Sequence, residues 1–146
     1  MEETGNALTV VVSDTGSTVS ASALNTLDGK TTVAVDATAA AGFSGALSDL
    51  VTLSGAIGST VTITGDETIA LTDTGSVAVA DINTVNAKTT GLVTADTVAT
   101  ITGTYAALDS FQTAEGSSEV SIGDDEAITV TDADITVAEF NDINDL

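Results

Sequence analysis

Two acidic turns contain the residue types in this chain that could bind a metal ion. Each turn begins with a glycine, at Gly65 and at Gly123, and leads into a run of β-branched residues that ends in an aspartate. Ca²⁺ takes six to eight oxygen ligands, so clustered carboxylates at turns suit it. The calcium candidates are Asp66, Glu67, Asp124, Asp125 and Glu126. Neither an EF-hand loop nor a glycine-rich calcium nonapeptide is present, so we expect both acidic turns to face water, and calcium binding is the alternative.

Catalytic constellations are difficult to build from this composition. The chain has no histidine and no cysteine, which removes Ser-His and Cys-His pairs and the usual zinc sites. Its two basic residues, Lys30 and Lys88, lie 58 positions apart at the expected ends of two helices, where a cation faces helix carbonyls. We therefore expect no enzyme activity, and no cofactor other than calcium.

The net charge of −20 limits the partners. The chain has 22 acidic residues against two basic ones, and a surface of this kind repels nucleic acid and anionic membranes. The uncharged runs are short and rich in threonine, serine and glycine, whereas a membrane span needs about 20 mostly apolar residues. We expect no membrane insertion.

The elements that position these residues repeat along the chain. The segments 18–32, 76–90 and 134–146 share one pattern of a short strand followed by a short helix. Aligning Leu24, Ile82 and Phe140 gives 82 − 24 = 58 and 140 − 82 = 58. Apolar residues at i, i+3 and i+6 in each segment predict one buried helical stripe. A constant period of this length indicates a repeat architecture.

A second helical stripe lies between the copies, centred on Leu50 and on Leu108. The steps between the five stripe centres alternate, since 50 − 24 = 26, 82 − 50 = 32, 108 − 82 = 26 and 140 − 108 = 32. From these steps we predict a β-rich repeat protein: a right-handed β-solenoid with short helices in alternating 26- and 32-residue coils. One segment spans residues 1–146, with double repeats at about 8–68 and 69–127 and a partial repeat at 128–146. Small β-sandwich modules are the alternative, and they fit a 58-residue double unit poorly.

The repeats resemble the Thr/Ala/Asp-rich tandem repeats of very large bacterial secreted proteins, which are haemolysin-type or adhesin-like. The resemblance rests on 7–37, ALTVVVSDTGSTVSASALNTLDGKTTVAVDA, and on its later copy at 68–96. It implies a secreted or extracellular bacterial surface location, and often calcium.

We therefore expect a structural segment of an extracellular surface, matrix or fibre protein. The alternative is a ligand-binding module that attaches to a glycan or a cell surface. Neighbouring repeats or self-association supply the expected partners, because no unit this small buries its apolar face alone. We expect self-association to use Ala7–Ser13, which the sequence predicts to be an uncharged strand at an open edge.

Overall fold

The computed structural model describes residues 6–123, 126–144 and 146. Its elements run in the order β1 (Thr18–Ser20), α1 (Ala21–Asp28), β2 (Val35–Asp36), β3 (Gly42–Gly45), α2 (Leu47–Ala56), β4 (Val61–Thr62) and β5 (Thr68–Leu71). They continue with β6 (Ser76–Ala78), α3 (Val79–Asn86), β7 (Val93–Thr94), β8 (Thr100–Gly103), α4 (Tyr105–Gly116), β9 (Val120–Ser121), β10 (Ala127–Val130) and α5 (Val137–Ile143).

The fold is mixed α/β, and the prediction of a β-rich β-solenoid is wrong. Over the residues that the structure describes, it is 33% helical and 25% strand, with parallel sheets and five helices and without a solenoid. Strands are only two to four residues long because glycine, aspartate and threonine turns interrupt them. The helix α4 has 12 residues and continues past its apolar stripe, which ends at Phe111, in a chain without proline.

The strands form parallel sheets whose partners are separated by nearly constant distances in sequence. One sheet has the order β1-β3-β5-β7-β9, a second has β10-β8-β6, and a third pairs β2 with β4. Thr18 pairs with Gly42 and Ser76 with Thr100, and the separation is the same in both pairs, since 42 − 18 = 24 and 100 − 76 = 24. The 58-residue relation found in the sequence therefore holds for strand register.

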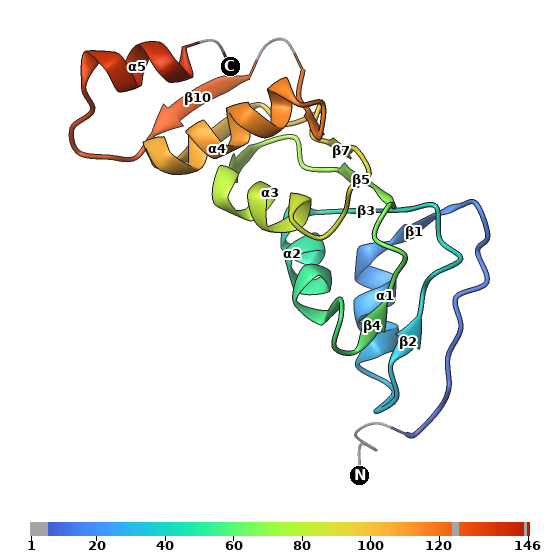
Figure 1. The fold of residues 1–146 in the computed structure, drawn as a ribbon. Helices are drawn as coiled ribbons and strands as arrows, with labels where there is room; N and C mark the ends of the chain where they lie inside the picture. Colours follow the sequence, from blue (N-terminus) through green and yellow to red (C-terminus); the bar gives the residue numbers. More distant parts are fainter. Residues whose placement is uncertain (1–5, 124–125, 145) are drawn as a thin grey trace.

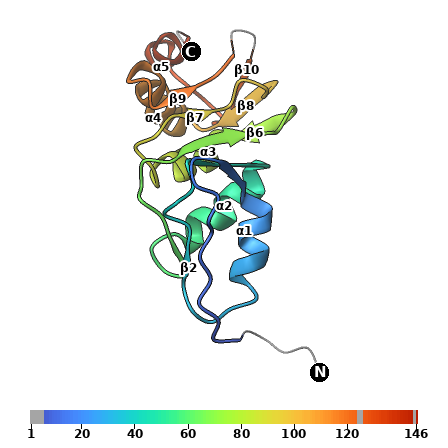
Figure 2. The ribbon, with the colours of Figure 1, turned by 90° about the vertical axis from the view of Figure 1, so that its right-hand side faces the viewer.

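The helices lie side by side in chain order (Figure 1). Each helix contacts the next, from α1 with α2 to α4 with α5, which places α1 and α5 at opposite ends of an elongated molecule (Figure 2). Apolar residues of the helices and strands form one connected core. Each helix has an apolar stripe that must be buried against other elements, and the neighbouring helices and strands supply that contact.

Four of the five expected stripe centres are confirmed as core residues. Leu24, Leu50, Ile82 and Leu108 are each 0–1% exposed. Phe140 is 54% exposed, so the prediction is wrong for α5. The reason is position: α5 packs on α4, and among the described residues no helix covers its other side.

The segment Ala7–Ser13 is not a strand. Near this segment the chain forms isolated parallel bridges only, Asn6 with Thr31 and Val11 with Asp36. Val12 is buried, while Leu8 and Val11 are more than half exposed. A run of β-branched residues without a continuous partner strand stays irregular, because backbone pairing stabilises a strand.

Candidate functional site

The first acidic turn is closed by its own glutamate. Both carboxylate oxygens of Glu67 are hydrogen-bonded: Oε1 accepts from the Thr64 backbone N–H and hydroxyl, both at 2.7 Å, and Oε2 accepts from the Gly65 N–H at 2.8 Å. Glu67 is 2% exposed, and Gly65 has the positive φ of 93° that the turn requires. A buried carboxylate held by three donors stabilises the turn, and its lone pairs are directed at the backbone.

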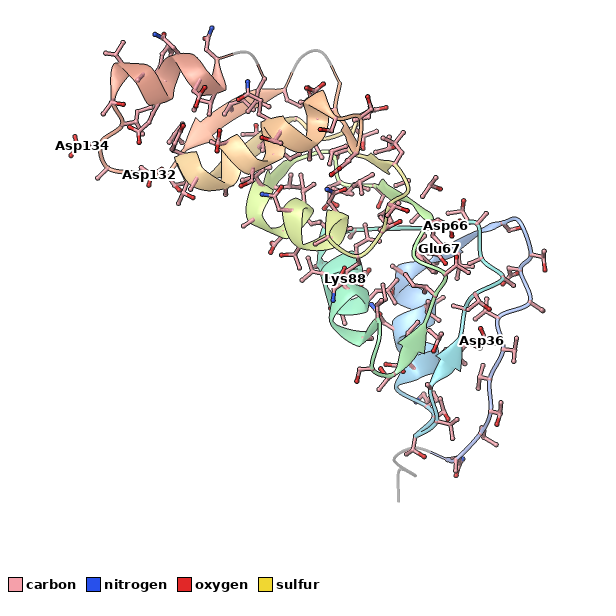
Figure 3. All side chains as sticks on the ribbon, in the orientation of Figure 1. Asp36, Asp66, Glu67, Lys88, Asp132 and Asp134 are labelled. Atoms are coloured by element: carbon pink, nitrogen blue, oxygen red, sulfur yellow. The ribbon has the colours of Figure 1, made fainter. Side chains whose placement is uncertain are left out.

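Asp66 lies beside Glu67 on the same turn (Figure 3). The Thr64 hydroxyl has a single hydrogen and lies within hydrogen-bond distance of both Asp66 Oδ1 and Glu67 Oε1, so the two carboxylates share this donor. Close by, a Cβ on Gly91 would collide with the Glu67 carbonyl oxygen, so only glycine fits against this turn. The structure therefore brings Asp66 and Glu67 together, with the Glu67 carboxylate turned inward.

The second acidic turn repeats part of this arrangement. Glu126 Oε1 accepts from the Gly123 N–H at 2.8 Å, as Glu67 does from Gly65. Asp124 and Asp125 lie outside the described residues. Within the described part of the chain, no three histidine, cysteine or acidic side chains come close enough to hold a metal ion. Calcium binding stays a prediction.

The aspartates that end β-rich runs cap helices of a neighbouring unit. Asp73 Oδ2 accepts from the Leu47 N–H at 2.7 Å, and Asp132 Oδ2 accepts from the Tyr105 N–H. Both donors are first residues of helices, whose N–H groups have no partner inside the helix. The residue before α2 is Ala46, which supplies no side-chain cap. The sequence showed only that an aspartate ends each of these β-branched runs. For Asp73, the signal for a capping role was Ala46, a residue before α2 that has no side chain able to cap the helix.

Asparagines join helices in the same way. Asn25 Nδ2 donates to the Asp49 carbonyl at 2.9 Å, and Asn83 Nδ2 donates to the Ala107 carbonyl at 2.9 Å. The first bond links α1 to α2 and the second links α3 to α4. The two asparagines are related by the repeat, since 83 − 25 = 58. The 58-residue period was therefore the sequence signal for their shared role, whereas the apolar stripes did not indicate this role.

A polar hollow of about 240 Å³ lies between α3 and α4. It is lined by Asn83, Asn86, Ala87, Ser110, Thr113, Ala114, Ser117 and Glu119. Asn86 Nδ2 donates to Glu119 Oε2 at 3.2 Å, which leaves Asn86 Oδ1 buried without a hydrogen-bond donor among the described residues. At the equivalent position of the first repeat, Asp28 Oδ2 instead accepts from the Thr60 hydroxyl at 2.9 Å. Hydroxyl, amide and carboxylate groups in one hollow can bind a small polar ligand.

Hydrogen bonds change the acidity of three exposed or partly exposed groups. The Asp142 carboxylate, which accepts from the Tyr105 hydroxyl at 2.6 Å, raises the pKa of Tyr105 to about 12. The Thr136 backbone N–H and hydroxyl lower the pKa of Glu139 in the capping box of α5. The Thr38 hydroxyl and N–H lower the pKa of Asp36. Each shift favours the protonation state that keeps its hydrogen bond.

The two lysines lie just after helices, as the sequence predicted. Lys30 follows α1 by two residues and Lys88 follows α3 by two, and both side chains are exposed. Figure 3 shows Lys88. Neither lysine lines the polar hollow.

The fold and these sites describe an α/β chain of repeated strand–helix units joined by hydrogen bonds at equivalent positions. Comparison with protein-family models, with known proteins and with solved structures found no match. Among the described helices, none has the length and apolar character needed to cross a membrane.

Proposed function

We propose that this chain is a non-catalytic structural segment in which strand–helix units support one another side by side. The observation that carries the proposal is the repetition of unit-to-unit hydrogen bonds. Asn25 and Asn83 make the same contact in successive repeats, and Asp73 and Asp132 cap the helices that precede them by one unit. These polar side chains link neighbouring units to one another, which is the use expected of a structural repeat.

The resemblance to large secreted bacterial repeat proteins supports a location at an extracellular surface, matrix or fibre. A surface with a net charge of −20 stays hydrated and separated from other acidic surfaces. Antibodies against the chain, applied to fractions of the cells that produce it, should detect it in the medium or on intact cells. Detection only after lysis would contradict this location.

A second function, binding of a glycan or cell surface, is favoured by the polar hollow between α3 and α4. One experiment distinguishes the two functions: the immobilised chain is exposed to a glycan array and to intact cells. A structural segment should show no saturable binding. Saturable binding that is lost in Ser110→Leu and kept in the matched variant Ser48→Leu, on the exposed side of α2, would overturn the structural proposal and favour a glycan site.

A further inference from the structure

The polar hollow between α3 and α4 has one charged side chain, Glu119, among the residues that line it. Asn86 Nδ2 donates to Glu119 Oε2 at 3.2 Å, and no described residue donates to Glu119 Oε1. The turn after α4 fixes the position of Glu119, because the Glu119 N–H donates to the Ala114 carbonyl at 2.9 Å and Ser118 has a φ of 61°. One oxygen of a carboxylate that is held in place is therefore open to a ligand.

The neutral groups that line the polar hollow mainly offer hydrogen-bond acceptors too. The Ser110 hydroxyl donates to the Ala106 carbonyl at 3.0 Å, and the Thr113 hydroxyl donates to the Asp109 carbonyl at 3.1 Å. A hydroxyl has one hydrogen and two lone pairs, so these two oxygens can only accept from a ligand. On the α3 side, Asn83 uses Nδ2 for its bond to α4, and no described residue donates to its Oδ1.

One negative charge surrounded by acceptors selects a particular chemistry. A protonated primary amine has three N–H donors, a positive charge and no acceptor, so it matches this lining group for group. An anionic ligand would be repelled by Glu119. A metal ion fits less well, because the hollow of about 240 Å³ supplies a single carboxylate, and no three acidic side chains of the described chain come together.

We infer that the polar hollow binds the protonated primary amine of a small ligand, either a free alkylamine or an amino sugar whose amine is not acetylated. This inference rests on the second function proposed above, because it names the ligand class of the same hollow. The ammonium group donates to Glu119 Oε1. The hydroxyl and amide oxygens of the lining accept its remaining hydrogens or the hydroxyl groups of the sugar.

The first test separates binding in the polar hollow from the general attraction of cations to a chain with a net charge of −20. Propylammonium and glucosamine hydrochloride are titrated in about 0.15 M sodium chloride, which screens distant charges, and NMR chemical shifts report binding. Glu119→Gln should weaken the binding by about tenfold, because the charged acceptor is lost. The matched variant Glu115→Gln removes the same charge from an exposed residue of α4 outside the hollow and should bind normally.

The second test uses ligand analogues to show which chemical groups the hollow recognises. N-acetylglucosamine lacks the charge and tetramethylammonium lacks the N–H donors, so both should bind at least about tenfold more weakly than the two amines. Saturable binding of both amines assigns the site to the ammonium group alone. Binding of glucosamine only identifies an amino sugar as the ligand, and binding of propylammonium only identifies an alkylamine.

Three results would overturn the inference: no saturable shift with either amine, binding of either analogue as tight as that of the amines, or equal losses in Glu119→Gln and Glu115→Gln. The last would mean that only the net charge attracts the cation. The second function itself is tested separately, by the glycan array and Ser110→Leu. Saturable glycan binding that is lost in Ser110→Leu, without binding of the amines, would keep the glycan site and reject the amine as its ligand.

Discussion

At Asp73 and Asp14 the same tripeptide, Asp-Thr-Gly, has two different uses. Asp73 accepts a hydrogen bond from the first residue of α2, whereas the Asp14 backbone carbonyl accepts from Ser17 within its own turn. The side chain of Asp73 is partly buried and that of Asp14 is exposed. The difference arises because a helix precedes Asp73 by one unit and none precedes Asp14 in the described chain.

Replacing Asp73 with alanine should destabilise the protein by about 1 kcal/mol, the usual cost of losing a helix cap. Leu47 N–H would then lack its acceptor at the start of α2, where Ala46 offers no replacement. Urea unfolding followed by circular dichroism measures the change. The matched variant Asp14→Ala should change the free energy of unfolding much less, and equal losses in the two variants would contradict the capping role.

Tyr105 is the single tyrosine, so its ionisation can be followed by ultraviolet absorbance. Its pKa should be about 12 in the native chain and should fall towards 10 in Asp142→Asn, which removes the charged acceptor. Because the folded-state pKa is raised, the stabilisation is fully present below about pH 10, the unfolded pKa, and is lost as pH rises through about 12. A titration near pH 10 in the native chain would show that the Tyr105–Asp142 bond does not form.

At the scale of the elements, equivalent residues differ in their surroundings. Ile82 in α3 is fully buried between α2 and α4, and Phe140 in α5 is more than half exposed. Ile82→Ala should cost roughly 2–5 kcal/mol through lost contacts and a cavity. Phe140→Ala in the monomer should cost clearly less, although it removes more atoms. Thermal unfolding of dilute samples compares the two, and a larger loss at Phe140 would mean that α5 is covered.

The helices and their buried stripes could be predicted from the sequence, but the relative amounts of helix and strand could not. The spacing of Leu24, Leu50, Ile82 and Leu108 located four helices and their core residues, because apolar periodicity reflects burial directly. Threonine-rich runs also predicted longer strands than exist. Strand length depends on whether a partner strand is available, as 7–13 and 134–136 show, and local composition does not contain that information.

The candidate site was predictable only in part. The sequence located the glycine and the acidic residues of the first turn. It did not indicate that Glu67 turns inward, because the partners of Glu67 include the backbone N–H groups of Thr64 and Gly65. The pairing of Asn86 with Glu119 and of Asp28 with Thr60 depends on register between units, 33 and 32 residues apart. Such pairs become visible only when the strands have been aligned.

At the scale of the whole molecule, the charge of −20 should make stability depend on salt. Sodium chloride should raise the melting temperature by screening repulsion between carboxylates. If the acidic turns bind calcium, millimolar calcium chloride should raise the melting temperature more than sodium chloride of equal ionic strength, because a ligand of the folded state alone stabilises it. Equal effects would contradict a calcium site, and Asp66→Asn is the variant that should remove any calcium-specific part.

The capping bond between Asp73 and Leu47 has a consequence for synthesis on the ribosome. The N–H of Leu47 emerges 26 residues before its acceptor, and that of Tyr105 emerges 27 residues before Asp132. Each of these two helices therefore lacks this capping hydrogen bond while its own unit is being translated. The bond can form only after the next unit has been translated. Folding should then follow translation with a lag of one unit, so a stalled chain would expose its most recent helix.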